Sequence, residues 1–532
     1  ERVLSSANSI VDALRERSVE ASGEPPSDRM LELALREYSR VFDEQEGGFG
    51  SAPKFPQSLQ ISLLLRVLRR LAEPEEQKLA RRMIELTLFK MARGGIYDQI
   101  GGGFHRYSTD ERWLVPHFEK MLYDNALLSV TYLEAYQLLK DNFYRQIGLE
   151  TLDYMQQEMQ SPEGGFYSAE DAGEVGLEGE FYVWSFEQLK SELSLDELKL
   201  AERYFGVTPQ GNFEHGKNIL VFDWGVPVET RAGQEFVALR KNLLEIRGKR
   251  QRPHRDEKIL CGWNGLALSA FAKGYQIGGE ERYLNAAQRC AEFLERIFVT
   301  EQGLKRRYFQ GSVGIEATHE DYAFFIDGLI ELYQSNFDLH WLELAIKLQD
   351  RQDAVFWDTN SPGYNFSVSE DAIIKKKDFL DNATPSANSV SLLNLIKLHG
   401  LAGEKRHYQR SRELAGLLSG LAHKYPLGFP KALSAFDYIL EGGKEIIVVN
   451  PRGGSAGYEF VRKIQADFNP NQVVALCEPI AIEAQTALKP AAGRTLEAGR
   501  TTVYVCREHV CSAPTVNLEE AAAMCSEIRR ME

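Results

Sequence analysis

The sequence predicts a mainly α fold, an (α/α)6 toroid of six helical hairpins that carries a small C-terminal α/β appendage. Helical patterns recur in pairs, with one member apolar on nearly all sides and the other amphipathic, which indicates an inner and an outer helix. One helix of each pair starts from a polar, small-residue entry, such as YDNALL at 123 or WNGLAL at 263. A glycine-aromatic turn, such as GGFG at 47, GGFY at 164 or GLKRRY at 303, recurs between the pairs. Short β-branched runs replace the helices after residue 443. Because open α-solenoids also alternate helix pairs, closure of the ring is an expectation.

The spacing of apolar residues places the elements in chain order. Helices are expected at residues 2–18, 28–43, 57–72, 77–93, 117–140, 142–160, 263–277, 281–298, 321–336, 341–357, 386–401 and 405–424. The alternating segment EGEFYVWS is expected to form a strand at 178–185. The toroid domain then covers residues 1–443, with an irregular insertion at about 173–260. In the appendage, residues 444–532, the runs EIIVVNP, NQVVALCE and TTVYVCRE are expected as strands of a parallel sheet.

The composition excludes several classes of protein. A net charge of −15 argues against a nucleic-acid binder, because phosphate contacts need clustered Lys and Arg. No apolar run approaches the roughly 20 residues that span a bilayer, so no membrane partner is expected. The six cysteines are sparse and irregularly spaced, which fits a reducing compartment and predicts a cytoplasmic location. The chain begins at Glu1 without a visible signal peptide, which is typical of a fragment or a processed form.

The segment GGIYDQIGGGFHRYSTDERWLVPHFEKMLYDN at 94–125 concentrates charged groups among glycines and aromatics. A packed core does not need this mixture, so the segment predicts an active-site loop carried by the helical scaffold. Structural alternatives stay open for several of its residues. Asp98 can close an Asx turn, Arg106 can pair with Asp98 or Asp110, and Asp124 can cap a helix.

Several motifs together resemble one family. They are GGFGSAPKFP, GGIYDQIGGGFHRYSTDERWLVPHFEKMLYDNA, GGFYSAEDA, EGEFYVW, WNGLALSAFAKG, EDYAFFIDGL and VYVCREHVCSAP. They resemble the thioredoxin-domain-containing family that includes spermatogenesis-associated protein 20 and its bacterial homologues. The toroid part of that family is similar to the N-acylglucosamine 2-epimerase and cellobiose 2-epimerase group. The resemblance implies a sugar-like ligand and, as a partner, a thioredoxin-like domain or protein, which this sequence with no Cys-x-x-Cys motif does not itself contain.

A 2-epimerase needs acid/base groups on opposite sides of a carbon next to a carbonyl. His117 and His105 are the expected catalytic bases. His117 and Glu119 are expected to open a helix, where side chains two residues apart point about 200° apart, so only one of the two is expected to face the cavity. The acid is expected from one of two acidic pairs in the chain: Glu170, Asp171, Glu320 and Asp321.

A glycoside hydrolase is the alternative enzyme, and it would use two of the same carboxylates across a glycosidic bond. Asp321 has a structural alternative as a helix cap. Aromatic rings expected to stack on a sugar belong to Tyr97, Trp113, Trp184 and Trp263. Polar side chains expected to bind the substrate belong to Lys54, Asp98, Arg106, Lys120, Asp124 and Asn264.

A third possibility is a non-catalytic ligand-binding or redox-partner module that works with a thioredoxin-like domain. No P-loop or dinucleotide fingerprint is present and no His-rich or Cys-rich spacing supports a metal site, so neither a cofactor nor a metal is expected. Cys506 and Cys511 lie close together in VCREHVC. Two reduced cysteines flanking a turn are the first expectation for them, and a redox pair or a metal clip is the alternative.

Overall fold

The computed structural model describes residues 25–531 except 175, 368–375, 480–486 and 509. The helix predicted at 2–18 lies outside these residues. The chain divides into two compact units, of which the first holds Leu35–Leu294 and Tyr308–Gly311. The second holds Glu1–Ala34, Glu295–Arg307 and Ser312–Glu532. Two further predicted helices, α2 (Asp28–Val41) and α11 (Glu281–Phe298), are confirmed.

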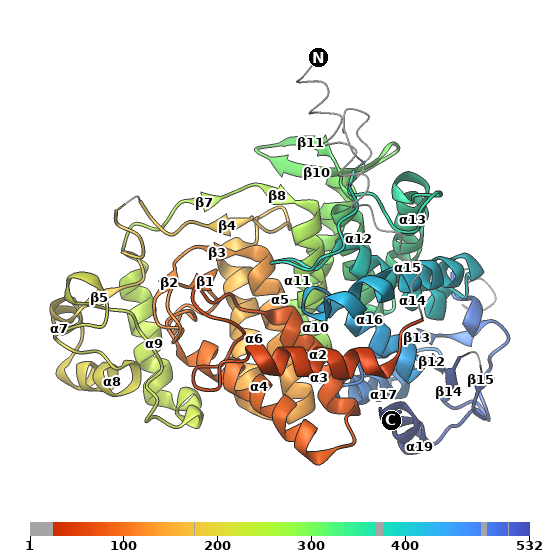
Figure 1. Cartoon of the computed structure of the whole chain (residues 1–532), viewed down its shortest axis with the longest axis horizontal. Coiled ribbons are helices and arrows are strands. Elements are labelled where there is room, and N and C mark those ends of the chain that lie inside the picture. Colours follow the sequence, from red (N-terminus) through yellow and green to blue (C-terminus); the bar gives the residue numbers. More distant parts are fainter. Residues whose placement is uncertain (1–24, 175, 368–375, 480–486, 509, 532) are drawn as a thin grey trace. The chain divides into compact units, whose positions relative to one another are not determined.

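The unit around Leu35–Leu294 is built from helix pairs, as predicted (Figure 1). The pairs begin with α3 (Ser58–Arg70) and α4 (Pro74–Arg93), followed by α5 (Leu122–Leu139) and α6 (Asn142–Tyr154), then α10 (Cys261–Gly278). Helix α6 continues as a π-helical turn at Met155–Met159. Helices α3, α5 and α10 pack on one another in sequence, and most of their residues are buried. Their all-round apolar patterns therefore report inner helices correctly.

The predicted start of the helix at 117 is wrong, because extended backbone precedes α5. Strand β2 (Pro116–His117) pairs with β1 (Tyr107–Ser108), so that His117 lies opposite Tyr107. Strand β3 (Lys120–Met121) pairs with β4 (Ala169–Glu170), which in turn pairs with β7 (Arg255–Asp256). These pairings take up backbone groups that a helix would have used internally, and they tie the 94–125 segment to two later loops.

The region expected as an irregular insertion contains regular helices. They are α7 (Phe186–Glu192), α8 (Leu195–Phe205) and α9 (Gln234–Arg247), and they share an apolar core. The strand predicted at 178–185 is reduced to β5 (Trp184–Ser185), which pairs with β6 (Lys217–Asn218). Gly179 has φ +77, and its carbonyl accepts the N–H groups of Tyr182 and Val183. This turn replaces the extended backbone that alternating hydrophobicity predicted.

The second unit repeats the pairing of helices with α12 (His319–Asn336), α13 (Leu339–Phe356), α14 (Ala387–Ala402), α15 (Lys405–Lys424) and α16 (Pro430–Glu441). Helices α12, α14 and α16 pack in sequence as the inner set. The segment from Gly303, expected as a turn, lies in β10 (Gly303–Phe309), which pairs with β9 (Val299–Thr300) and precedes β11 (Ser312–Glu316).

The three strands predicted in the C-terminal region are present, but their sheet is mixed rather than parallel. Strand β12 (Lys444–Val449) pairs in parallel with β13 (Gln472–Cys477) and antiparallel with β14 (Thr502–Arg507), which continues into β15 (Val510–Cys511). Helices α17 (Ala456–Gln465) and α19 (Leu518–Ser526) share an apolar core with the sheet. This sheet lies in the same compact unit as α12 to α16, and the domain boundary at residue 443 stays a prediction.

An asparagine near the start of an inner helix holds each of three glycine-aromatic turns. Asn264 Oδ1 accepts the N–H of Phe166 at 2.6 Å, and its Nδ2 donates to the Phe166 carbonyl at 3.0 Å. Asn125 makes the same pair of bonds to Phe104, as does Asn388 to Tyr364. All three asparagines are fully buried. The repeated entry and turn motifs in the sequence are therefore two halves of one structural clamp.

Candidate functional site

The deepest charged residues of the 94–125 segment form an ion-paired cluster. Both carboxylate oxygens of Asp98 accept hydrogen bonds from Arg247 at 2.8 Å, and Lys120 Nζ donates to one of them at 2.9 Å. Burial would raise the pKa of Asp98, but Arg247 and Lys120 hold that pKa well below its usual value. Asp98 also accepts backbone N–H groups two and three residues further on, which confirms the Asx-turn alternative. Substrate binding by Asp98 and Lys120 stays a prediction.

Other expected substrate-binding residues are enclosed with partners of their own. Tyr97 donates to Glu150 at 2.6 Å, and the Trp113 indole donates to the Glu46 carbonyl at 2.9 Å. Lys54 donates to Asp43 at 2.5 Å. The Trp184 ring is fully buried, and its centroid lies 3.7 Å from Arg250 Cζ. Asn264 holds the Phe166 turn. These side chains would have to be uncovered before a sugar could contact them.

His105 is buried between aromatic rings. Its Nδ1 lies 2.8 Å from the Phe118 carbonyl, and its ring centroid lies 4.6 Å from that of Tyr182. Burial, together with the charge of nearby Lys120, lowers the pKa of His105 to about 3. The ring is therefore neutral and a weak base near pH 7. A general base works best with a pKa near the working pH, so His105 in this environment is poorly suited to the catalytic role predicted for it.

The two acidic pairs lie in separate compact units. In the first, Glu170 is buried and bound by Arg252 at 2.9 Å and by the Tyr154 hydroxyl at 3.0 Å, whereas Asp171 is exposed. In the second, Arg306 binds Glu320 at 3.1 Å and Asp321 at 2.9 Å.

Asp321 also completes a capping box at the start of α12. Its Oδ2 accepts the backbone N–H of Thr318 at 2.8 Å, and Thr318 is the N-cap residue. The capping alternative is therefore correct in kind, with Asp321 at the third helical position. Its predicted catalytic role is untested, as are those of Glu170, Asp171 and Glu320.

Arg106, His117 and Glu119 form a polar group that solvent reaches. Arg106 Nη1 donates to Glu119 Oε2 at 3.0 Å, and His117 Nε2 lies 3.5 Å from the same oxygen. The His117 ring stacks on Tyr107 at a centroid distance of 5.1 Å. The expectation that His117 and Glu119 point apart is wrong, because the backbone here is extended and positions two apart share a side. The predicted partners of Arg106, Asp98 and Asp110, are replaced by Glu119.

Asp124 lies beside this group, at the third position of α5. Asp124 is 8% exposed, and its Oδ2 has no hydrogen-bond partner among the described residues. Burial, opposed by Arg106 and reinforced by Glu119, raises the pKa of Asp124 well above its usual value. The N-cap of α5 is Met121, which makes no side-chain cap, so the capping alternative for Asp124 is wrong.

Two rings complete the surroundings of Asp124. Tyr123 lies 4.8 Å from Trp263 between ring centroids, in an edge-to-face arrangement, and Trp263 is half-buried. Burial, with the nearby carboxyl of Asp124, raises the pKa of Tyr123 to about 12. We use the name Asp124 cluster for the set Arg106, Tyr107, His117, Glu119, Tyr123, Asp124 and Trp263.

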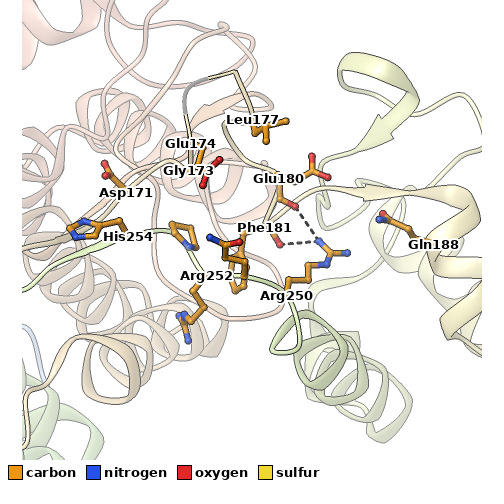
Figure 2. A pocket seen from close by; sticks show the side chains of 12 residues that line it. Asp171, Gly173, Glu174, Leu177, Glu180, Phe181, Gln188, Arg250, Arg252 and His254 are labelled. Carbon is orange, nitrogen blue, oxygen red and sulfur yellow. Dashed lines mark hydrogen bonds between the residues drawn. The ribbon is translucent and has the colours of Figure 1, made fainter.

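A separate cavity of about 830 Å³ lies in the same unit, between loops near residues 171–181 and 250–254 (Figure 2). Asp171, Arg252 and His254 line it. Arg250 donates to the carbonyl of Phe181 at 2.9 Å, so this arginine also holds the cavity wall together. Of the predicted catalytic residues only Asp171 lines this cavity. Within the described residues no group of three or more His, Cys, Asp or Glu is placed to hold a metal ion.

The sequence-based site lacked three residues that hold its parts together. Arg247 and Arg252 come from the insertion more than 80 residues away in sequence, and no local motif points to them. The third is Glu119, because the helix predicted here would point its side chain away from His117. Pro116 gives no signal against a helix that begins at 117, since proline is tolerated in the first turn.

No family model matches the chain. Human spermatogenesis-associated protein 20 is 33% identical over 96% of this chain and 72% of its own length, and the rat protein is 33% identical over 96% and 71%. The mouse protein is 33% identical over 91% of this chain and 67% of its own length. The chain belongs to the spermatogenesis-associated protein 20 family. This membership confirms the resemblance, while the thioredoxin-like domain implied with it stays a prediction.

Two solved structures show a distant similarity to this chain. Cellobiose 2-epimerase from Spirochaeta thermophila has a TM-score of 0.46 at 11% identity, covering 82% of this chain and 98% of its own. A GH76 α-mannanase from Bacteroides thetaiotaomicron has a TM-score of 0.46 at 11% identity, covering 77% and 94%. The chain itself is mainly helical, as predicted. No helix in the described part of the chain is long and apolar enough to cross a membrane.

Proposed function

We propose that the chain is a sugar-active enzyme of the N-acylglucosamine 2-epimerase-like type and that the Asp124 cluster performs its acid/base chemistry. The observation that carries the proposal is the buried carboxyl of Asp124, whose Oδ2 has no partner among the described residues. A buried polar atom without a partner costs stability unless a ligand or another group serves it. Burial raises the pKa of Asp124 and so favours the protonated carboxyl, the form that can donate a proton or a hydrogen bond.

The neighbouring residues supply the other parts that the reaction needs. If His117 directs its Nε2 proton toward Glu119, its Nδ1 is left as the proton acceptor. Arg106, fixed by Glu119, places a positive charge where an enediolate oxygen can develop. Trp263 and Tyr123 offer ring edges and faces to a pyranose. In this proposal His117 removes the proton next to the carbonyl, and Asp124 stabilises the oxyanion by donating a hydrogen bond.

Hydrolysis of a glycosidic bond is the second candidate, because the cluster holds two carboxyl groups in different surroundings. Asp124, whose pKa burial raises, would be the acid, and Glu119 accepts a hydrogen bond from the charged Arg106. A protonated acid facing a carboxylate is the arrangement that glycosidases use. The same two residues would then act as the general acid and as the base or nucleophile.

The test is to incubate the protein with mono- and disaccharides and aldose–ketose pairs in D2O. Deuterium incorporation at the carbon next to the carbonyl, followed by NMR, reports epimerase or isomerase chemistry, and release of reducing ends reports hydrolysis. Asp124→Asn and His117→Gln should lower the active rate by about 10²- to 10⁴-fold, the usual contribution of a general acid or base. Asp141→Asn is the matched control, because Asp141 caps α6 and asparagine caps equally well.

Two results would contradict the proposal in this form. Equal rates for Asp124→Asn and Asp141→Asn would remove Asp124 from the chemistry. A sugar that raises the melting temperature of the wild type but is never turned over would instead favour the ligand-binding module. The partnership with a thioredoxin-like domain is a separate proposal that this test leaves untouched.

A further inference from the structure

The sulfur atoms of Cys506 and Cys511 form a disulfide between β14 and the edge strand β15 of the C-terminal sheet. The two residues lie directly opposite each other on β14 and β15. The first expectation, two reduced cysteines, is therefore wrong for this pair. Cys506 is fully buried whereas Cys511 is exposed, so a reagent in solution can reach one sulfur and not the other.

A single guanidinium contacts both sulfurs. Arg494 Nη2 lies 3.1 Å from Cys511 Sγ and 3.4 Å from Cys506 Sγ. The arginine is held in place, since its Nε donates to the Pro490 carbonyl at 2.9 Å and its guanidinium lies 4.6 Å from the Tyr504 ring centroid. A disulfide itself needs no positive charge, whereas a thiolate is stabilised by one.

The other four cysteines form no disulfide and, unlike Cys511, none of them is exposed. Cys261, Cys290, Cys477 and Cys525 are buried and unbonded to one another. Burial raises the pKa of the Cys477 thiol to about 11 and that of the Cys525 thiol to about 12. Thiols of this kind are unreactive near pH 7, so the accessible sulfur chemistry of the chain is confined to Cys511 and its partner.

We propose that Cys506, Cys511 and Arg494 form a dithiol–disulfide exchange site whose substrate is a dithiol, on a small molecule or a protein. The incoming thiolate attacks Cys511 Sγ, the exposed sulfur, and forms a mixed disulfide. The bond between the two cysteines breaks, and Cys506 leaves as a thiolate that faces Arg494. In the mixed disulfide the first sulfur of the dithiol is bonded to Cys511. The second thiolate of the dithiol attacks this first sulfur and releases Cys511 as a thiolate. The dithiol becomes a disulfide, and its two electrons and two protons end on the cysteines.

Arg494 is a positioning and charge-stabilising residue in this scheme. An opposite charge at this range lowers the pKa of an acidic group by about 1–3 units. The pKa of the exposed Cys511 thiol in the reduced protein is therefore expected below the value of about 8.5 for a free cysteine. This site is independent of the Asp124 cluster, and failure of either proposal leaves the other standing.

The experiment begins with mass spectrometry of the full chain under non-reducing conditions, to establish the Cys506–Cys511 bond. The chain is then reduced with dithiothreitol, and alkylation of Cys511 by iodoacetamide is followed against pH. Arg494→Met should raise the pH of half-maximal alkylation by about one unit, because the thiolate loses its cation. Arg500→Met is the matched control, an exposed arginine of the same loop, and should leave the profile unchanged.

Two single cysteine variants test which sulfur is attacked. Incubated with oxidised glutathione, Cys506→Ser should form a mixed disulfide at Cys511, whereas Cys511→Ser should resist because its one remaining sulfur of the pair is buried. The proposal is overturned if the bond is absent from the folded chain or if dithiothreitol reduces it only after unfolding. Equal alkylation profiles for Arg494→Met and Arg500→Met, or equal glutathionylation of the two cysteine variants, would overturn it as well.

Discussion

Asn264→Ala should destabilise the protein strongly, because this side chain makes three buried hydrogen bonds, two of which hold the Phe166 turn. The amide accepts from the Phe166 N–H at 2.6 Å and donates to the carbonyls of Phe166 and Leu260 at 3.0 and 2.9 Å. The two bonds that the amide donates contribute about 1 kcal/mol each, and the Phe166 N–H that loses its acceptor costs about 1–3 kcal/mol, so the expected loss is about 3–5 kcal/mol. Alanine offers no group that can replace any of these bonds.

The assay is thermal unfolding followed by circular dichroism and calorimetry. For a cooperative unit of about 250 residues the expected loss lowers the melting temperature by roughly 6–10 °C. Asn285→Ala is the matched control, since Asn285 is exposed on α11 and alanine is the better helix former, so its stability should change by about 0.5 kcal/mol or less. Asn125→Ala and Asn388→Ala should behave as Asn264→Ala does, because both make the same clamp.

Two results would refute the clamp. The first is an Asn264→Ala protein that melts within about 1 °C of Asn285→Ala, since exposed substitutions change stability by no more than that. The second is an Asn264→Ala protein that keeps its melting temperature but loses the stabilisation by a sugar. That outcome would return Asn264 to the substrate-binding role that the sequence suggested.

Three further substitutions test the electrostatics and backbone geometry. Burial holds the pKa of His319 at about 3, so the neutral ring contributes stability above about pH 6.5 that is lost as the pH falls, by about 2 kcal/mol at pH 5. Between pH 7 and 5 the melting temperature of His319→Gln should therefore fall less than that of the wild type. An equal fall in the two proteins would contradict this. Lys120→Met removes one partner of buried Asp98 and should cost about 3 kcal/mol in denaturant titrations, whereas an unchanged midpoint would mean that the pair contributes nothing. Gly103→Ala and Gly311→Ala both place alanine at positive φ, but only at Gly103 would the Cβ meet a tyrosine ring, at 2.4 Å, so a larger loss of melting temperature is expected there and equal losses would exclude the clash.

The clearest error of sequence reasoning concerns the six residues before α5. The run PHFEKM has apolar and polar residues that fit a helical period, so the helix was extended back to His117. In the structure these residues pair with strands near 107 and 169 instead. Periodicity describes one segment at a time, and such pairing depends on partners that are distant in the chain. The same error predicts that the side chains of His117 and Glu119 point apart, whereas the structure brings them together.

The sequence by itself determined most of the helices outside the 173–260 insertion and which of those are buried on all sides. Helix α11 at 281–298 and α15 at 405–424 have the predicted bounds, because a long amphipathic period and local capping are properties of the chain alone. It also identified the glycine-aromatic turns and the polar helix entries as repeated motifs.

Only the tertiary structure decided what the polar residues do. Asp98 and Lys120 became a buried ion pair because Arg247 arrives from the insertion, and Asn264 became a clamp because the Phe166 turn folds over it. Asp124 differs from them because the fold buries its carboxyl without supplying a partner among the described residues for one oxygen. The energetics of a charged or polar group depend on burial and on neighbours brought from elsewhere in the chain, neither of which is encoded in its local sequence.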